Sequence, residues 1–166
     1  MSINLRNRYL IRGETTILFD RKDNKIIVDT EDLEKLSKYK WYVDKSKGYV
    51  FATVDRKIRM HKYILDEKGF VDHINRNRSD NRKSNLRRCS ITENNRNKGL
   101  SRNNKLKAKG VIETKDHNRT KKYRARIEVN GKKKHLGYFK TKEEAQDAYN
   151  KAAAEYFGEY AAPIPP

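Results

Sequence analysis

The sequence predicts an α+β protein in which a small mixed N-terminal sheet is followed by a three-stranded antiparallel sheet packed on one α-helix. Three observations predict it. Short apolar or β-branched runs separated by polar turns fill residues 1–60, which is typical of hairpins. Apolar and polar residues alternate over 123–129, directly before Asn130-Gly131, the pattern of a half-buried strand entering a tight turn. Apolar residues then recur at helical spacing from Ala145 to Phe157.

The N-terminal region begins with the runs YLIRG, TTILFD and KIIVDT, which predict strands joined by polar turns. Thr30 precedes two acidic residues and Leu33, so we expect a short helix with Thr30 as its N-cap. Aromatic residues flank Lys47-Gly48, where we expect a hairpin. We interpret them as core rather than a ligand site, because large rings supply most of the burial in a small domain. They are Trp41, Tyr42, Tyr49 and Phe51.

Residues 57–98 predict a second group of elements. KIRMH is a short strand leading into a helical turn at YIL, and the polar stretch 71–86 follows. Ser90 and Glu93 have the spacing of a capping box, so we expect a helix from Ile91 that carries Asn94 near its start. The predicted local order is therefore strand, polar turn, strand and helix. His61 fits two interpretations, a structural residue, which we favour, or a phosphate contact.

The C-terminal region predicts a hairpin and a helix. A two-residue turn at Asn130-Gly131 pairs Val129 with Lys132; continued without interruption, it pairs Ala125 with Leu136 and Tyr123 with Tyr138. Lys134 then falls on the apolar face. We expect its side chain to snorkel, with the ammonium group reaching water at the rim of that face. Thr141 and Glu144 form a second capping box, and Gly158 lies where an αL cap is expected. The apolar stripe of this helix is Ala145, Ala148, Tyr149, Ala152, Ala153, Tyr156 and Phe157.

The composition indicates a polyanionic partner. Lys and Arg number 40 against 22 Asp and Glu, a formal net charge of +18 with a pI of about 9.9. Nucleic acid is the leading partner for such a charge, whereas a membrane is disfavoured because no apolar run approaches 18 residues. The charge is uneven: residues 95–134 hold fifteen basic and three acidic residues, and 141–166 hold two and five. The single cysteine, Cys89, excludes an internal disulfide and a structural zinc site with paired cysteines.

The stretch VDHINRNRSDNRKSNL, residues 71–86, contains an Asp72-His73 pair in basic surroundings. Together with Asn85 in KSNLR and Asn94 in ITENNRN, it resembles the H-N-H motif of HNH nucleases, which have the ββα-metal fold. The second and third motif residues follow His73 by 12 and 21 positions, which resembles the phage and intron-encoded homing endonucleases, and RMHKYIL resembles the lead-in of that branch.

The resemblance implies a role for each motif residue. His73 is the expected general base, whose ordinary pKa of ~6.5 suits proton transfer near neutral pH. Asn85 is expected to orient its imidazole. Asp72 and Asn94 are the expected ligands of a divalent metal, Mg²⁺ first and Mn²⁺ as the alternative, because both offer hard oxygen donors. Adjacent residues on a strand point to opposite faces, so we expect a local bend that aims Asp72 and His73 at one phosphate.

A second resemblance covers KGVIETKDHNRTKKYRARIEVNGKKKHLGYFKTKEEAQDAYNKAAAEYFG. Its marks KGV, YRARI, HLGYF, EEAQDAY and AAAEYFG resemble an APETALA2-type DNA-binding domain of the ERF kind. The basic face of its sheet is expected to contact DNA, and the arginines of the HNH turn are expected to contact phosphates. The expected DNA-binding residues are Arg76, Arg78, Arg82, Arg124, Arg126, Lys133 and His135.

The two resemblances imply an HNH nuclease domain over 1–98 with its motif at 57–98 and a DNA-binding domain over 109–162, joined by a basic linker over 99–108. We expect a metal-dependent homing-type endonuclease of double-stranded DNA, acting as a monomer without a small-molecule cofactor. Its expected location is the cytoplasm of a bacterial or phage-infected cell. One alternative is a non-catalytic DNA-binding regulator that retains an HNH scaffold. Another, favoured by charge alone, is an RNA-binding protein.

Overall fold

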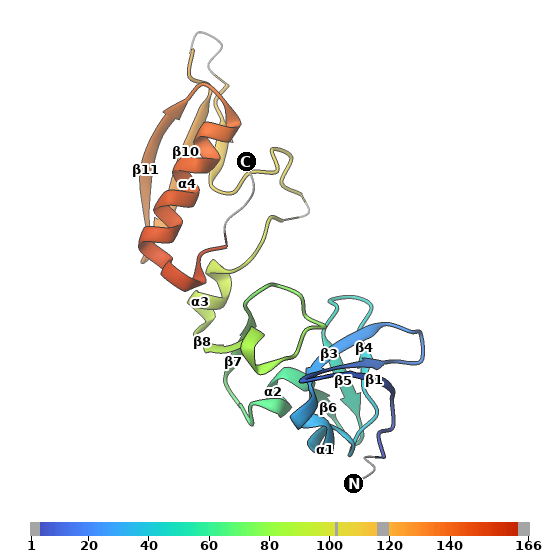
Figure 1. Ribbon diagram of the computed structural model, residues 1–166. Coiled ribbons are helices and arrows are strands. Elements are labelled where there is room, and N and C mark those ends of the chain that lie inside the picture. The colour runs from blue at the N-terminus through green and yellow to red at the C-terminus, as the bar shows by residue number, and fades with distance from the viewer. Residues whose placement is uncertain (1–3, 102, 116–119, 163–166) are drawn as a thin grey trace. The chain divides into compact units, whose positions relative to one another are not determined.

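The computed structural model describes residues 4–101, 103–115 and 120–162, and the chain forms two compact units, Met1–Asn94 and Asn95–Pro166. Figure 1 shows an α+β chain with several small sheets and few helices. None of the helices in the described residues is long and apolar enough to cross a bilayer. The first unit holds β1 (Arg8–Arg12), β2 (Thr15–Phe19), β3 (Lys25–Asp29), η1 (Thr30–Asp32), α1 (Leu33–Leu36), β4 (Tyr42–Val43), β5 (Val50–Thr53), β6 (Lys57–Arg59), α2 (Met60–Ile64), β7 (Phe70–His73), η2 (Lys83–Asn85) and β8 (Leu86–Cys89).

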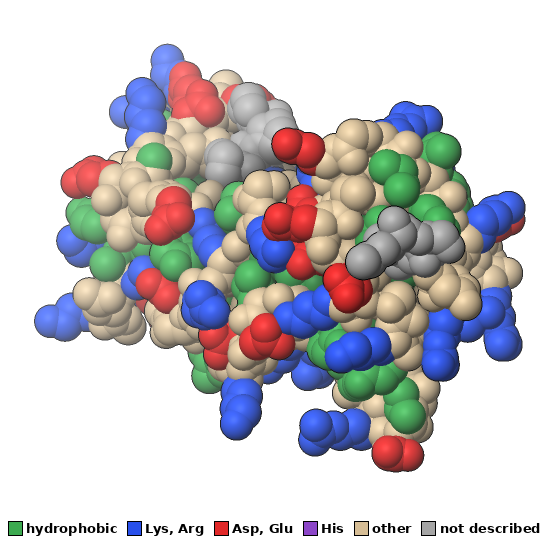
Figure 2. Space-filling view, turned by 60° about the horizontal axis from the view of Figure 1, so that its bottom comes forward, with side chains coloured by type: hydrophobic (Ala, Val, Ile, Leu, Met, Phe, Trp, Pro, Cys, Tyr) green, Lys and Arg blue, Asp and Glu red, His purple; other side chains and the backbone are tan. Residues whose placement is uncertain are grey.

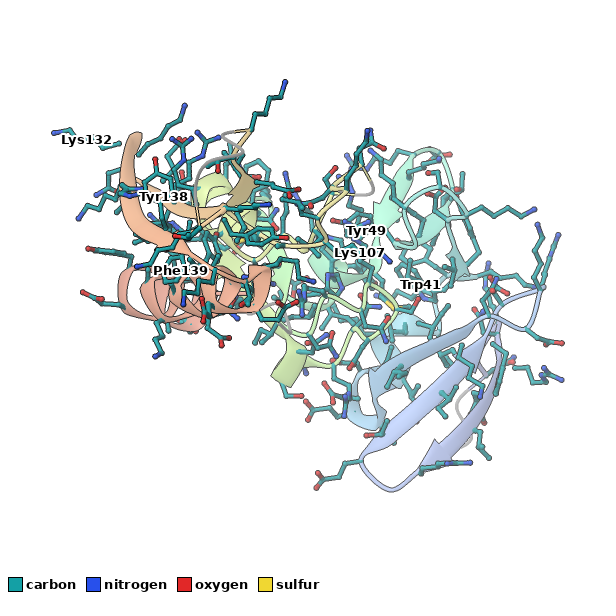
Figure 3. The ribbon with its side chains drawn as sticks, turned by 90° about the horizontal axis from the view of Figure 1, so that it is seen from above. Trp41, Tyr49, Lys107, Lys132, Tyr138 and Phe139 are labelled. Carbon is teal, nitrogen blue, oxygen red and sulfur yellow. The ribbon has the colours of Figure 1, made fainter. Side chains whose placement is uncertain are left out.

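The strands of the first unit form three antiparallel sheets, β1-β2-β3, β4-β5-β6 and β7-β8. Leu18, Ile26 and Val28 alternate inward along β2 and β3, and they join the fully buried Trp41 in one core. The indole Nε1 of Trp41 donates to the Leu36 carbonyl at 2.9 Å, so the large ring is buried with its polar atom satisfied. This confirms the hairpin-rich start and the core role of Trp41, which Figure 3 labels.

The expected N-cap at Thr30 is wrong. Thr30 lies inside η1, whose N-cap is Asp29, without a side-chain capping bond. The Thr30 hydroxyl instead donates to the Gly13 carbonyl at 2.8 Å. The hydroxyl therefore links the start of the helical segment to the β1–β2 turn.

The order β7, η2, β8 and α3 (Ile91–Arg96) follows the predicted strand, polar turn, strand and helix. The capping box is present, because the Ser90 amide donates to Glu93 at 2.7 Å and the Glu93 amide donates to the Ser90 hydroxyl at 3.2 Å. The polar turn 74–85 is pinned to β3. The Ile27 amide donates to the Ser79 carbonyl at 2.8 Å, and the Asn81 amide donates back to the Ile27 carbonyl at 2.7 Å.

The second unit contains β9 (Val111–Glu113), β10 (Tyr123–Val129), β11 (Lys132–Phe139), α4 (Lys142–Phe157) and η3 (Gly158–Tyr160). The sheet order is β11-β10-β9, all antiparallel, and α4 lies along one face (Figure 1). Asn130 and Gly131 both have positive φ, 52° and 75°, as a two-residue turn requires. The expected capping box of Thr141 and Glu144 is also present.

The β10–β11 register agrees with the prediction only near the turn. Val129 pairs with Lys132 and Ile127 with Lys134, but a bulge between Ala125 and Arg126 shifts the rest, so Ala125 faces Gly137 and Tyr123 faces Phe139. Gly137, at φ 130°, adopts backbone that a side chain disfavours. A bulge adds one extra residue to one of the two strands, which an uninterrupted register cannot include.

Lys134 confirms the expected snorkelling at the rim of the apolar face. Its Nζ lies 3.1 Å from the Tyr156 hydroxyl and 4.3 Å from the centroid of that ring. The apolar stripe of α4 is otherwise mostly buried, although Tyr156 itself is 37% exposed. Gly158 has φ 52° but ψ −128°, so it leads into η3 rather than forming the expected αL cap.

The segment 99–108 has no helix or strand in its described part, 99–101 and 103–108. The residues on either side of this segment make contacts within the second unit. Lys109 Nζ donates to the carbonyls of Arg96 and Lys98 at 2.9 and 2.6 Å, and the Arg96 guanidinium lies 4.7 Å from the Phe157 ring centroid. Arg96 and Lys98 before the segment, and Lys109 after it, are therefore held by hydrogen bonds to one another and by the contact of Arg96 with Phe157.

Candidate active site

Asp72 and His73 end β7, and both residues are buried, with 6% and 4% of their surface exposed. Asp72 lies directly opposite Arg87 on β8. The Arg87 guanidinium donates to Asp72 Oδ2 from Nη2 at 2.9 Å and from Nε at 3.2 Å. The Asp72 carboxylate is therefore charge-paired within the ββα unit formed by β7, β8 and α3 (Phe70–Arg96).

The His73 imidazole packs among polar aromatic groups. Its ring centroid lies 5.0 Å from that of His61, nearly edge-on, and 6.0 Å from that of Tyr49. Its Nε2 lies 3.3 Å from Asn81 Oδ1. Burial lowers the pKa of His73 below its ordinary value, although the bond to Asn81 and the nearby Asp72 carboxylate act in the opposite direction. Burial therefore favours the neutral form of the imidazole.

Asn85 is buried in the turn. Its side-chain amide forms hydrogen bonds with the backbone of the turn and not with the His73 ring. Oδ1 accepts from the Asn75 amide at 2.9 Å, and Nδ2 donates to the Asp80 carbonyl at 2.8 Å. The contact with the His73 ring that we expected of Asn85 is made by Asn81. Asn85 braces the turn that carries Asn81.

Asn94 lies in α3, half-buried, and lines a groove of about 700 Å³ in the first unit. His61 lines the same groove, as do aromatic and basic side chains from β5, β6 and the β4–β5 turn. A groove of this composition suits an anionic, partly planar ligand such as a nucleic-acid strand. Its lining residues are Asp44, Ser46, Lys47, Tyr49, Phe51, Lys57, Arg59, His61, Lys62, Phe70, Val71 and Asn94.

Two comparisons with known proteins agree with this geometry. Residues 63–96 match the HNH endonuclease family, a segment that contains β7, the pinned turn, β8 and α3. A protein of Acanthamoeba polyphaga mimivirus described as an uncharacterized HNH endonuclease is 35% identical over 160 residues, which cover 92% of this chain and 76% of that protein. The chain belongs to the HNH endonuclease family. It is an endonuclease, a DNA hydrolase. No solved structure matches the chain.

The matched HNH segment contains the predicted motif residues Asp72, His73, Asn85 and Asn94. The structure brings Asp72 and His73 together on β7 and puts Asn85 at the base of the turn between the strands. Their buried side chains contact different neighbours, Arg87 for Asp72 and Asn81 for His73. The family match and the HNH endonuclease relative support the endonuclease over the non-catalytic regulator.

The three arginines of the HNH turn differ in their surroundings. Arg76 is exposed, with a φ of 63°. The Arg78 guanidinium lies 4.4 Å from the Tyr49 ring centroid and donates to the Lys47 carbonyl at 2.6 Å. Arg82 binds the buried Asp80 carboxylate through Nε and Nη2 at 2.9 and 2.7 Å. Burial alone would raise the pKa of Asp80, but Arg82 holds it below the ordinary value, so Arg82 stabilises the turn.

The four residues expected to bind DNA from the second unit lie on β10 and β11. Arg126 and His135 are directly paired across the strands, and both are exposed, as is Lys133. Arg124 is half-buried, and its Nε has no hydrogen-bond partner among the described residues. The His135 ring centroid lies 4.9 Å from that of Tyr138. In Figure 3, Lys132 projects outward from the end of this hairpin.

Sequence reasoning does not single out Asn81 and Arg87 near the HNH motif, and it favours a structural role for His61. Asn81 was overlooked because asparagines are frequent in this stretch, and Arg87 because only the strand register reveals its position opposite Asp72. His61 was interpreted as structural. It is 3% exposed, its Nδ1 has no hydrogen-bond partner among the described residues, and burial lowers its pKa to about 3. Its place before the motif was the available signal.

Among the described residues, one group of three acidic side chains has the spacing of a metal site: Asp29, Glu31 and Asp32. The Lys83 ammonium already lies there, 2.7 Å from Glu31 and 2.8 Å from Asp32. The Lys83 backbone amide also donates to Asp29 at 2.7 Å. The group therefore anchors the HNH turn through a lysine.

Proposed function

We propose that the protein hydrolyses double-stranded DNA as a metal-dependent, homing-type HNH endonuclease. His73 is the general base, Asp72 and Asn94 hold a divalent metal, and the second unit binds DNA. The proposal is carried by one observation, the buried His73 imidazole that follows Asp72 at the end of β7 and contacts Asn81.

The chemistry assigned to His73 is proton transfer from water. The water proton passes to the imidazole, the water oxygen attacks phosphorus, and the bond from phosphorus to the 3′ oxygen breaks. A neutral imidazole is needed for this step, and burial of His73 favours the neutral form. Asn85 supports the base by bracing the turn through Asn75 and Asp80.

The donors available to a metal are oxygens. The Asp72 carboxylate and the Asn94 amide suit Mg²⁺ better than zinc, with Mn²⁺ as a substitute. The ion would neutralise charge on the phosphate and on the departing oxygen. The Arg87 guanidinium, 2.9 Å from Asp72, holds that carboxylate in place.

Basic side chains support the assignment of DNA as the substrate. Lys47, Lys57, Arg59 and Lys62 line the groove that also contains Asn94, and such cations neutralise phosphates and release counterions. Lys and Arg side chains also project widely from the face drawn in Figure 2. Arg76 and Arg78 are exposed on the HNH turn, where they would extend this contact.

We further propose that the second unit is an APETALA2-type module that selects the DNA site. Its three-stranded sheet carries Arg126 and His135 side by side and Lys133 nearby, on exposed positions. Arginine forks suit both phosphates and guanine edges. The resemblance of HLGYF and AAAEYFG to that family supports the assignment.

The test is cleavage of supercoiled plasmid and of a random-sequence DNA library with Mg²⁺, and both strands are read separately. We expect nicks or double-strand breaks at preferred sites that disappear with EDTA. His73→Ala should abolish cleavage and leave the Kd for DNA within about twofold. Lys151→Ala, an exposed change on α4, is the control. Cleavage by His73→Ala at the normal rate would remove His73 from the mechanism.

A further inference from the structure

Asn81 is fully buried, and each polar atom of its side chain has a different partner. Its Oδ1 lies 3.3 Å from His73 Nε2, and its Nδ2 donates to the Arg78 carbonyl at 3.3 Å. Turning the amide by 180° would put an oxygen against the Arg78 carbonyl and an N–H group against the imidazole. The Arg78 contact therefore requires Oδ1 to face His73, and His73 Nε2 must be the donor.

The backbone of Asn81 is held as firmly as its side chain. Its amide donates to the Ile27 carbonyl at 2.7 Å, next to the parallel bridge between Ile27 and Asp80. Two residues later, Lys83 is ion-paired to Glu31 and Asp32. The amide that faces His73 is thus fixed to β3 and η1.

We propose that Asn81 is a positioning residue that fixes the tautomer and ring orientation of His73, so that Nδ1 is the atom that takes the proton from water. The inference rests on the proposed role of His73 as the base. In a neutral imidazole, one nitrogen carries the proton and the other the lone pair. Donation from Nε2 to Asn81 therefore assigns the lone pair to Nδ1.

Asn81 and Asn85 then have separate tasks. Asn85 engages its two amide atoms with Asn75 and Asp80, which closes the turn. Asn81 reaches the imidazole from the segment that this closure holds. Partners that orient metal-ligating histidines typically change activity roughly 10–100-fold when removed, and we expect an effect of similar size for Asn81.

The first experiment uses the metal-free, DNA-free wild-type protein. Imidazole ¹⁵N shifts, measured by NMR above pH 7 and assigned to His73 with the His73→Gln variant, report which nitrogen is protonated. We expect the Nε2–H tautomer. A dominant Nδ1–H tautomer would overturn the proposal without any need for a variant at Asn81.

The second experiment compares two isosteric variants. Asn81→Leu keeps the size but lacks the acceptor, whereas Asn81→Asp keeps an oxygen facing His73. With Asn81→Leu we expect mixed His73 tautomers and a single-turnover cleavage rate roughly 10–100-fold lower, at an unchanged Kd for DNA. Asn81→Asp should keep the proton on His73 Nε2, because a carboxylate oxygen still faces that atom, although the donor to the Arg78 carbonyl is lost. Asn77→Ala is the control, because its exposed amide lies in the same turn and accepts from Ser79.

The outcomes separate this inference from the proposed function. If the wild-type protein shows the expected tautomer but does not cleave DNA, the proposed function is rejected and the contact between Asn81 and His73 is kept. Active enzyme whose His73 tautomer and rate are unchanged in a folded Asn81→Leu variant would reject the positioning role alone. Folding is checked by circular dichroism, and the wild-type spectrum decides the tautomer if Asn81→Leu does not fold.

Discussion

Asp72 and Arg87 form a buried ion pair between directly opposed residues of β7 and β8, with side chains only 8% and 10% exposed. Both guanidinium donors reach the same carboxylate oxygen. A protein loses much more stability when one partner of such a pair is removed than when both are replaced, because a single remaining charge stays buried. It joins the proposed metal ligand to the scaffold of the ββα unit.

Arg87→Met should therefore lower the free energy of unfolding by roughly 3 kcal/mol, since it removes the guanidinium from a buried carboxylate. The double variant Asp72→Asn with Arg87→Met should lose less than the sum of the single changes. Urea unfolding of the four proteins measures this coupling. Strict additivity would mean that the pair contributes nothing beyond its separate side chains.

The buried His61 predicts a pH dependence of stability. Burial lowers its pKa to about 3, whereas the unfolded chain has an ordinary value of ~6.5. Between these values the unfolded state binds the additional proton, so stability rises with pH in this window and is fully present above ~6.5. The slope from this residue is at most about 1.4 kcal/mol per pH unit.

His61→Gln should flatten the stability profile between pH 4 and 6, as measured by urea unfolding at each pH. His135→Gln is the matched control, because that imidazole is exposed. A wild-type slope that persists in His61→Gln would assign the pH dependence to other groups.

Gly110 is predicted to tolerate no side chain. At φ 70°, an added Cβ would overlap the Tyr149 ring and the Arg126 carbonyl oxygen, and the Gly110 carbonyl also accepts from the Arg126 amide at 2.9 Å. Gly110→Ala should cost more than about 2 kcal/mol, because steric overlap adds to the strain of a positive φ. Gly131→Ala, at φ 75° with nothing within 4 Å, should cost only about 1 kcal/mol. Thermal unfolding that ranks the two equally would contradict the close packing.

DNA binding should depend steeply on salt and on the exposed face of β10 and β11. Each phosphate contact adds about 0.9 to the slope of log K against log salt concentration. Arg126→Ala should weaken binding roughly tenfold and reduce this slope or relax site preference, whereas Lys151→Ala on α4 should change neither. Fluorescence anisotropy at several salt concentrations measures both quantities. A flat salt dependence would argue against electrostatic DNA binding by this chain.

The local features of both units could be predicted from the sequence because each depends on neighbours within a few residues. Alternation over 123–129 and the Asn130-Gly131 pair predicted the hairpin. The capping boxes at Ser90 and Thr141 are also present. The bulge beside Ala125 was not predictable, because it depends on how two strands fit against one helix. The cap at Thr30 was wrong for a similar reason, since a turn distant in sequence takes its hydroxyl.

For the candidate site, the sequence by itself determined the local order of strand, turn, strand and helix that carries Asp72, His73, Asn85 and Asn94, since each element depends on neighbours within a few residues. Only the tertiary structure decided their partners. Asn81 reaches His73 because β3, far away in the sequence, pins the turn, and Arg87 meets Asp72 because of the strand register. Backbone periodicity is encoded locally, whereas the orientation of a buried polar group depends on every hydrogen-bond partner that packing brings within reach.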